Sequence, residues 1–282
     1  MVLVAPRSVR RETSALGAET GRDEVLALLR NGSGQRPRFD PGLAGGLRAW
    51  LEDAASTVVG ARGEDAPRLF LGPRQLLGEP VDGVEAAGSL SGALVTACLV
   101  HALFRQIVTT GSVNDPLADG LSALAVDPRR GELVRQVGGL GPVDREALSS
   151  ALRVHVANLF ELTPRFAPGW LPRTDDRVAI PLAGGRVVLH GLFDLLVGAP
   201  VPETASLCAV GLTPEGPWAL ARRRLHYLAL LETLRSGSPP FRVGLLHSGA
   251  GRYGVEDVLE EHLGAVASHL AGRLSEMARA GA

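Results

Sequence analysis

The chain has 282 residues, is 45% hydrophobic, and carries 29 arginines, no lysine and 30 acidic side chains for a net charge of −1. A chain of this size buries a core without disulfides, and its near-neutral charge argues against wrapping nucleic acid over the whole surface. The absence of lysine excludes a catalytic ammonium group, and the distant Cys98 and Cys208 exclude a disulfide framework or a Cys-x-x-Cys metal motif.

Residues 1–40 are rich in arginine, glycine and polar residues, and their low periodicity predicts a weakly ordered N-terminal arm. A single domain is expected at 41–282. Residues 1–11 contain no apolar segment of the kind that a signal peptide requires, and the apolar run at 90–104 is shorter than a membrane span. These features predict a cytoplasmic protein with no membrane partner.

Residues 41–165 are expected to be mainly helical. Apolar residues recur at helical spacing from Leu43 to Val58, which predicts an amphipathic helix. A short apolar run at 69–71 suggests a strand or turn that leads into a short helix. Residues 89–109 are apolar nearly all round, which is typical of a central buried helix, and His101 is their polar landmark.

Residues 166–282 are expected to carry the sheet. Alternating apolar residues up to Leu182, a Gly184-Gly185 turn and a β-rich run at 186–197 predict a hairpin. Further strands are predicted at 206–212 and 241–246, with a helix between them and another helix at the end of the chain. The expected sheet therefore has about four strands.

Three motifs follow this element order. His101 lies in the buried helix, a Gly-x-x-Asp pattern ends at Asp194, and Arg223 precedes Tyr227 by four residues. Over residues 89–275 the chain resembles RecB-like PD-(D/E)XK nucleases, with Arg223 where that family has glutamine, and residues 170–174 are similar to a segment of actinobacterial members. The resemblance implies an α/β fold with a restriction-endonuclease-like core, a mixed sheet flanked by helices, after an N-terminal helical region.

The resemblance also implies a site that has lost its chemistry. In the family, an acid and a lysine alternate on the strand after the Gly-x-x-Asp motif and support metal-dependent phosphodiester hydrolysis. Here Val210 occupies the acid position and Leu212 the lysine position. Asp194 and His101 would then be a vestigial catalytic pair, and no cofactor is expected.

An alternative keeps the activity in a rearranged site. Asp194, His101 and Glu215 would bind Mg²⁺ or Mn²⁺ there, although Glu203 and Glu215 only bracket a strand that has no acid between residues 204 and 214. His190 lies two residues before Asp194, on the same face of an unbroken strand, so a cluster of His190, Asp194 and His101 is expected.

Arg222, Arg223 and Arg224 form the densest basic run, and with Tyr227 they are predicted to contact nucleic acid; a solvated helix face is the other interpretation. Three functions stay open. The chain is a non-catalytic nuclease-fold module that binds DNA or a protein partner, an active metal-dependent DNA nuclease, or a structural scaffold subunit. The sequence leaves the oligomeric state undecided.

Overall fold

The computed structural model describes residues 20–30, 38–63, 65–77, 92–199 and 207–281. Much of the predicted arm lies outside these residues. Within it, Thr20–Arg30 forms helix α1, and Val25 and Leu29 on one face of this helix are buried. Their four-residue spacing places both side chains on the face of the helix that packs into the core. The expectation of a weakly ordered segment is therefore wrong for residues 20–30.

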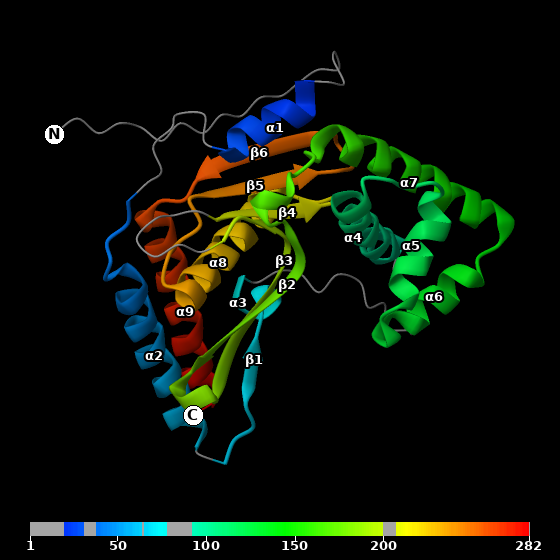
Figure 1. The fold of residues 1–282 in the computed structure, drawn as a ribbon. Helices are drawn as coiled ribbons and strands as arrows, with labels where there is room; N and C mark the ends of the chain where they lie inside the picture. The colour runs from blue at the N-terminus through cyan, green and yellow to red at the C-terminus, as the bar shows by residue number, and fades with distance from the viewer. Residues whose placement is uncertain (1–19, 31–37, 64, 78–91, 200–206, 282) are drawn as a thin grey trace.

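The described residues form helices and strands in the order drawn in Figure 1. The helices are α1, α2 (Leu43–Arg62), α3 (Pro73–Leu77), α4 (Gly92–Thr110), α5 (Pro116–Ala125), α6 (Gly131–Gly138), α7 (Pro142–Leu162), α8 (Trp218–Ser236) and α9 (Glu260–Gly281), with 3₁₀ turns at Pro128–Arg130, Pro168–Trp170 and Ala183–Gly185. The strands are β1 (Leu69–Leu71), β2 (Arg173–Leu182), β3 (Val187–Val197), β4 (Cys208–Thr213), β5 (Arg242–His247) and β6 (Arg252–Asp257).

Six strands of the described chain form one mixed sheet. β2 and β3 form the expected hairpin, β4 is antiparallel to β3, and β5 is parallel to β4 after the α8 crossover that a parallel pair requires. β1 pairs in parallel with β3, and β6 is antiparallel to β5. The α/β class is confirmed, and the sheet has two strands more than the four expected.

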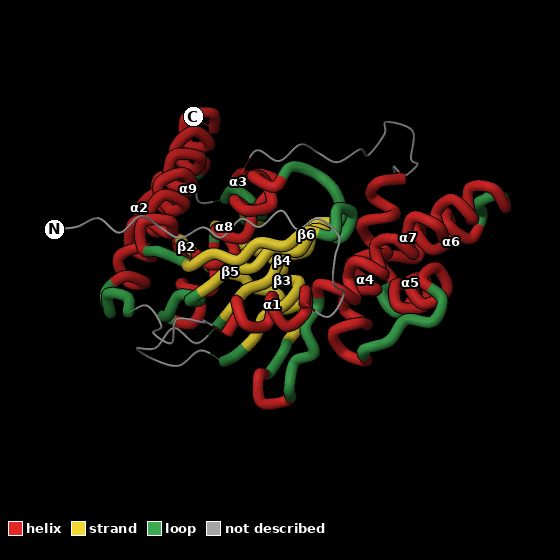
Figure 2. Tube along the Cα trace, turned by 90° about the horizontal axis from the view of Figure 1, so that it is seen from above, coloured by secondary structure: helices red, strands yellow, loops and turns green. Residues whose placement is uncertain are grey.

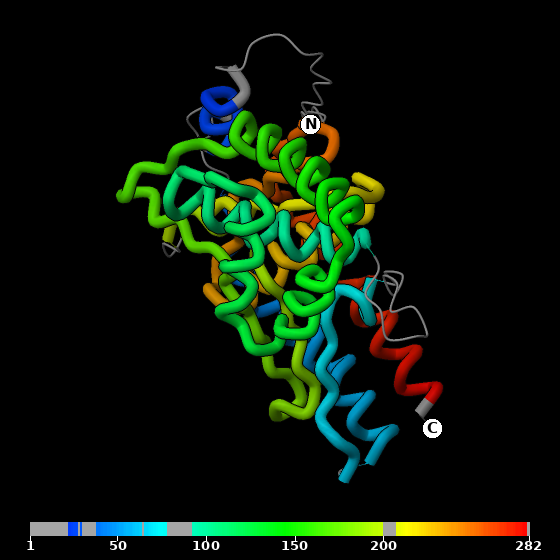
Figure 3. Tube along the Cα trace, turned by 90° about the vertical axis from the view of Figure 1, so that its right-hand side faces the viewer, coloured from blue at the N-terminus to red at the C-terminus, as the bar shows by residue number. Residues whose placement is uncertain are grey.

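Helices cover both faces of the sheet (Figure 2). α2, α8 and α9 pack on one face over an apolar cluster that includes Tyr227, Leu228 and Leu231. On the other face, α1 and the group α4–α7 pack over a second cluster that includes Val210 and Leu212. Figure 3 shows α4–α7 in front of the sheet. Each of the two apolar clusters therefore contains residues of the predicted helical part, 41–165, and of the predicted sheet-bearing part, 166–282.

Among the described residues, α4 is the one helix that is long and apolar enough to cross a membrane by length and composition. Seven of its residues, among them Leu99, Leu103 and Phe104, are buried. The helix packs against α5 and α7. Such packing is typical of the core helix of a folded domain. A core helix of this kind also meets the length and composition criteria for a membrane-spanning helix.

Candidate functional site

Two strands share one edge of β3. Residues 187–189 pair with β1 and residues 195–197 pair with β4, while β2 covers the opposite edge. In the described part of the chain, residues 190–194 therefore have no neighbouring strand on the shared edge. Two cavities, of about 610 and 210 Å³, are lined by residues of this interval, and Arg224 of α8 lines both. The interval is the place where the sheet leaves room for a ligand.

Asp194 is buried where β3 and β4 separate. The backbone pairing between β3 and β4 stops at Leu195. Beyond that position the backbone N–H of Leu212 donates to the side-chain oxygen Oδ2 of Asp194 at 2.8 Å. The other carboxylate oxygen, Oδ1, lies 2.9 Å from Nδ1 of His101 on α4. Each oxygen therefore has a partner in the protein, which compensates for the desolvation of a buried carboxylate.

The pKa of Asp194 lies below its ordinary value. Burial alone raises this pKa, but the charge and hydrogen bond of His101, the charge of Arg224 and the hydrogen bond from Leu212 together lower it by more. The carboxylate is consequently ionised at neutral pH. It is 8% exposed, whereas the His101 side chain is 32% exposed, so solvent reaches the pair from the α4 side.

β4 places aliphatic side chains next to this carboxylate. Val210 pairs in register with Leu195, and both Val210 and Leu212 are buried in the cluster under α4–α7. Only the backbone of Leu212 reaches Asp194. The strand thus brings the two positions that the resemblance assigns to an acid and a lysine beside Asp194, and it supplies neither a carboxylate nor an ammonium group there.

Glu215 does not complete a metal site with Asp194 and His101. It is exposed two residues beyond β4, in a turn where the Thr213 hydroxyl donates to the Glu215 carbonyl at 2.7 Å. Although Glu215 and Asp194 line the same 210 Å³ cavity, no three acidic, histidine or cysteine side chains are grouped for a metal ion anywhere in the described residues. Glu203 lies outside them. The expected three-residue metal set is corrected accordingly.

His190 is also separate from the pair. Its exposed ring packs against Gly72, where a Cβ would lie 2.8 Å from the ring atom Cε1. The simple alternation of β3 ends at Asp194, because Phe193 and Leu196 belong to one apolar cluster and Leu195 to the other. The Asp194 side chain therefore turns toward β4, and the expected cluster with His190 does not form.

Tyr227 is not a surface residue, which corrects its predicted contact with nucleic acid. The ring is fully buried, and its hydroxyl donates to the carbonyl of His190 at 3.0 Å and to that of Leu71 at 3.3 Å. Burial raises the pKa of this hydroxyl, so it is neutral at physiological pH. Tyr227 therefore links α8 to the end of β1 and to the interior of β3.

The three arginines of α8 have different surroundings. Arg222 forms an ion pair with Glu256 of β6 at 2.7 Å, and the His226 ring nitrogen Nε2 lies 2.7 Å from the same carboxylate. Burial raises the pKa of Glu256, but these bonds lower it to about 2. Arg223 is exposed, and Arg224 is half-buried beside the two cavities. Arg222 is thus a structural residue, and Arg224 is placed to meet a ligand.

Sequence reasoning missed three residues that line the larger cavity: Phe70, Arg74 and Arg177. Arg177 alternates outward along β2, between the half-buried Asp176 and the buried Val178, and this alternation was the available signal. Phe70 is 60% exposed on a strand of three residues, too short for a pattern to reveal.

Comparisons with known proteins found no relative: no family model, no curated protein and no solved structure matches the chain. The side chains themselves are therefore the basis for assigning a function.

Proposed function

We propose that this chain is a nuclease-fold protein that binds nucleic acid without hydrolysing it. The fold part of the proposal is a restriction-endonuclease-like core. It is supported by the element order, in which α4 with His101, the β2–β3 hairpin with Asp194, β4, α8 and β5 follow one another as the resemblance implies. The sheet also contains β1 and β6, which flank this core.

One observation carries the loss of catalysis. The carboxylate of Asp194 is held by His101 and by the backbone of Leu212, and the neighbouring strand adds only aliphatic side chains. Hydrolysis of a phosphodiester needs carboxylates that hold a divalent metal, and a cation that stabilises the charge developing on the phosphate. Asp194 is therefore better explained as a buried structural carboxylate than as a metal ligand.

No described residue near Asp194 can take the catalytic role that lysine has in the family. The chain contains no lysine, and arginine cannot transfer a proton at neutral pH. Arg224 is the basic residue nearest to this role, because it lines the Asp194 cavity and its charge lowers the pKa of Asp194. It can attract a phosphate group but cannot act as a general acid.

The cations around residues 190–194 favour nucleic acid over a protein partner. Arg74, Arg177 and Arg224 come from three different elements and line one cavity together with His190. Because the net charge of the chain is −1, such a local group of cations is the feature that would attract a polyanion. A scaffold subunit would not need it.

Binding of labelled DNA by wild type and by Arg224→Ala, measured by fluorescence anisotropy between about 50 and 200 mM salt, tests this proposal. We expect wild-type affinity to fall steeply with salt, and Arg224→Ala to weaken binding and to reduce the salt slope by about one. Arg145→Ala, which removes an exposed arginine of α7, is the matched control and should behave as wild type. Absence of binding by the wild type even at low salt would instead favour a protein partner or a scaffold role.

A further inference from the structure

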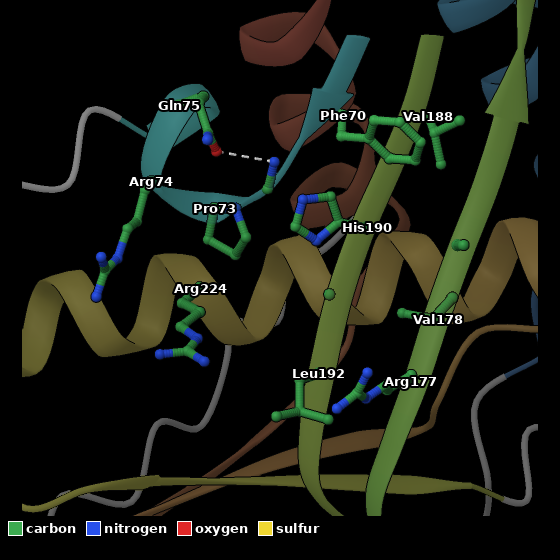
Figure 4. Close-up of a pocket in the computed structure, with 13 residues that line it drawn as sticks. Phe70, Pro73, Arg74, Gln75, Arg177, Val178, Val188, His190, Leu192 and Arg224 are labelled. Carbon is green, nitrogen blue, oxygen red and sulfur yellow. Dashed lines mark hydrogen bonds between the residues drawn. The ribbon is translucent and has the colours of Figure 1, made fainter. Parts of the chain in front are cut away.

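The larger cavity is a groove between α3 and the β2–β3 hairpin, open above α8 (Figure 4). We call it the arginine groove. Its described lining residues are Phe70, Gly72, Pro73, Arg74, Gln75, Arg177, Val178, Ala179, Val188, His190, Gly191, Leu192 and Arg224. Its volume of about 610 Å³ lies within the range of about 300–1,000 Å³ that small-ligand sites have.

The permanently charged side chains in the described lining of the groove are all arginines. It has three arginines and one histidine, and none of the described lining residues is acidic. Other arginines nearby are neutralised: Arg235 pairs with Asp176 at 2.8 Å, and Arg222 pairs with Glu256. Within the described residues Arg177 has no such carboxylate partner, so its charge is available to an anion.

The positions of the cations are fixed by different parts of the fold. Figure 4 shows Arg74 and Arg224 on one side of His190, and Arg177 on the other side, across β3. The start of α3 is held by a hydrogen bond from the Gly72 N–H to Gln75 Oε1 at 3.0 Å. A chain of phosphates running across β3 would pass Arg224 on one side of the strand and Arg177 on the other.

An exposed aromatic ring lies in the same groove. Phe70 of β1 pairs in register with Val188 of β3, and it is 60% exposed. Figure 4 shows it beyond His190, at the end of the groove away from Arg177 and Arg224. Proteins that bind single-stranded nucleic acids stack a base on such an exposed aromatic ring while arginines elsewhere in the same groove bind the phosphates.

We infer that the arginine groove binds a single-stranded nucleic acid, with phosphates on Arg177 and Arg224 and an unpaired base stacked on Phe70. This inference rests on the proposed function and adds to it the strandedness of the ligand and the residues that select it. A base held in a duplex is stacked on its neighbours and cannot pack against Phe70, so the groove should prefer an unpaired strand.

The test is fluorescence anisotropy with a labelled oligothymidylate and with a duplex of the same length. Five variants are compared with wild type: Phe70→Ala, Arg177→Ala and Arg177→Lys in the groove, and the exposed controls Trp50→Ala on α2 and Arg145→Ala on α7. We expect tighter binding of the single strand, a loss of about tenfold for Phe70→Ala that is confined to the single strand, and a salt slope reduced by about one for Arg177→Ala. Arg177→Lys, which keeps the charge, should restore most of the binding.

The outcomes separate this inference from the proposed function. If the wild type binds nucleic acid but Phe70→Ala and Arg177→Ala bind as tightly as the two controls, the groove is not the site and the proposed function still stands. A preference for the duplex would also overturn the inference. No binding of either ligand by folded wild type would overturn both. Thermal unfolding of each variant confirms that it is folded before its binding is compared.

Discussion

Replacing Asp194 with alanine is expected to lower the free energy of unfolding by roughly 3–5 kcal/mol, because hydrogen bonds to an ionised group each contribute about 1.5–3 kcal/mol and two are lost. The substitution removes the acceptor for the Leu212 N–H and leaves the His101 ring without its carboxylate. Urea unfolding followed by circular dichroism measures this loss. Asp53→Ala, which removes an exposed carboxylate of α2, is the control and should change stability by less than about 0.5 kcal/mol.

The effect of Asp194→Ala should depend on pH in one direction. Because the folded-state pKa of Asp194 is below its ordinary value of 3.8, the ionised carboxylate stabilises the fold fully above that value. This contribution is lost as the pH falls through the lower, folded-state pKa. We therefore expect the difference between wild type and Asp194→Ala to shrink below about pH 4. A difference that grows on acidification would contradict the assigned pairing.

Introducing an acid on β4 is the second substitution with a large expected effect. Val210 is 2% exposed within the cluster under α4–α7, and its methyl groups lie near the position that a Cβ on Gly244 would take. Val210→Glu should therefore destabilise the protein by roughly 3–5 kcal/mol, because it buries a charge without a partner. Denaturant unfolding checks the size of the loss.

Val210→Thr is the matched control, since it nearly keeps the volume and replaces one methyl group with a hydroxyl. Its expected loss is about 1–3 kcal/mol. Comparing Val210→Glu with Val210→Thr separates the effect of burying a charge from the effect of replacing the valine side chain. If Val210→Glu were as stable as Val210→Thr, or if Mn²⁺ stabilised it strongly, the acid position would face a cation site and the assignment of β4 to a purely apolar environment would be wrong.

The hairpin and the helical core were predictable because their patterns are local. Alternation up to Leu182 and the Gly184-Gly185 turn correctly gave β2 and β3, and the apolar run around His101 gave α4. β6 was missed because its sequence, from Arg252 to Asp257, is polar at both ends and only Tyr253 is buried. Its position at the sheet edge permits this composition, and an edge strand has no strong sequence pattern.

The interpretation of α8 failed for a different reason. The helical spacing of Tyr227, Leu230, Leu231 and Leu234 predicts one buried face. In the structure every residue from Leu225 to Leu234 is buried, including Glu232. α8 lies against the sheet and also against α2 and α9, so it has little solvent-facing surface over these turns. Glu232 is tolerated because Arg235 pairs with it. Periodicity shows which face is apolar, but it cannot show how many neighbours a helix has.

The partner of Asp194 could be predicted only in part. A carboxylate in an apolar strand requires a partner, and His101 was a reasonable candidate from the element order. The second partner, the N–H of Leu212, is a backbone group whose position depends on where β3 and β4 separate. The arginine groove could not be predicted from the sequence for the same reason. Its three arginines and His190 come from four elements that meet only in the folded chain.

The proposed function requires that the protein binds nucleic acid and does not hydrolyse it. The most direct test incubates purified wild type with labelled single-stranded and duplex DNA in Mg²⁺ and in Mn²⁺, beside Asp194→Asn to identify any contaminating nuclease. The proposed function predicts intact substrate in every metal condition, while the same preparation still binds DNA. Metal-dependent cleavage by the wild type that disappears in folded Asp194→Asn would contradict it.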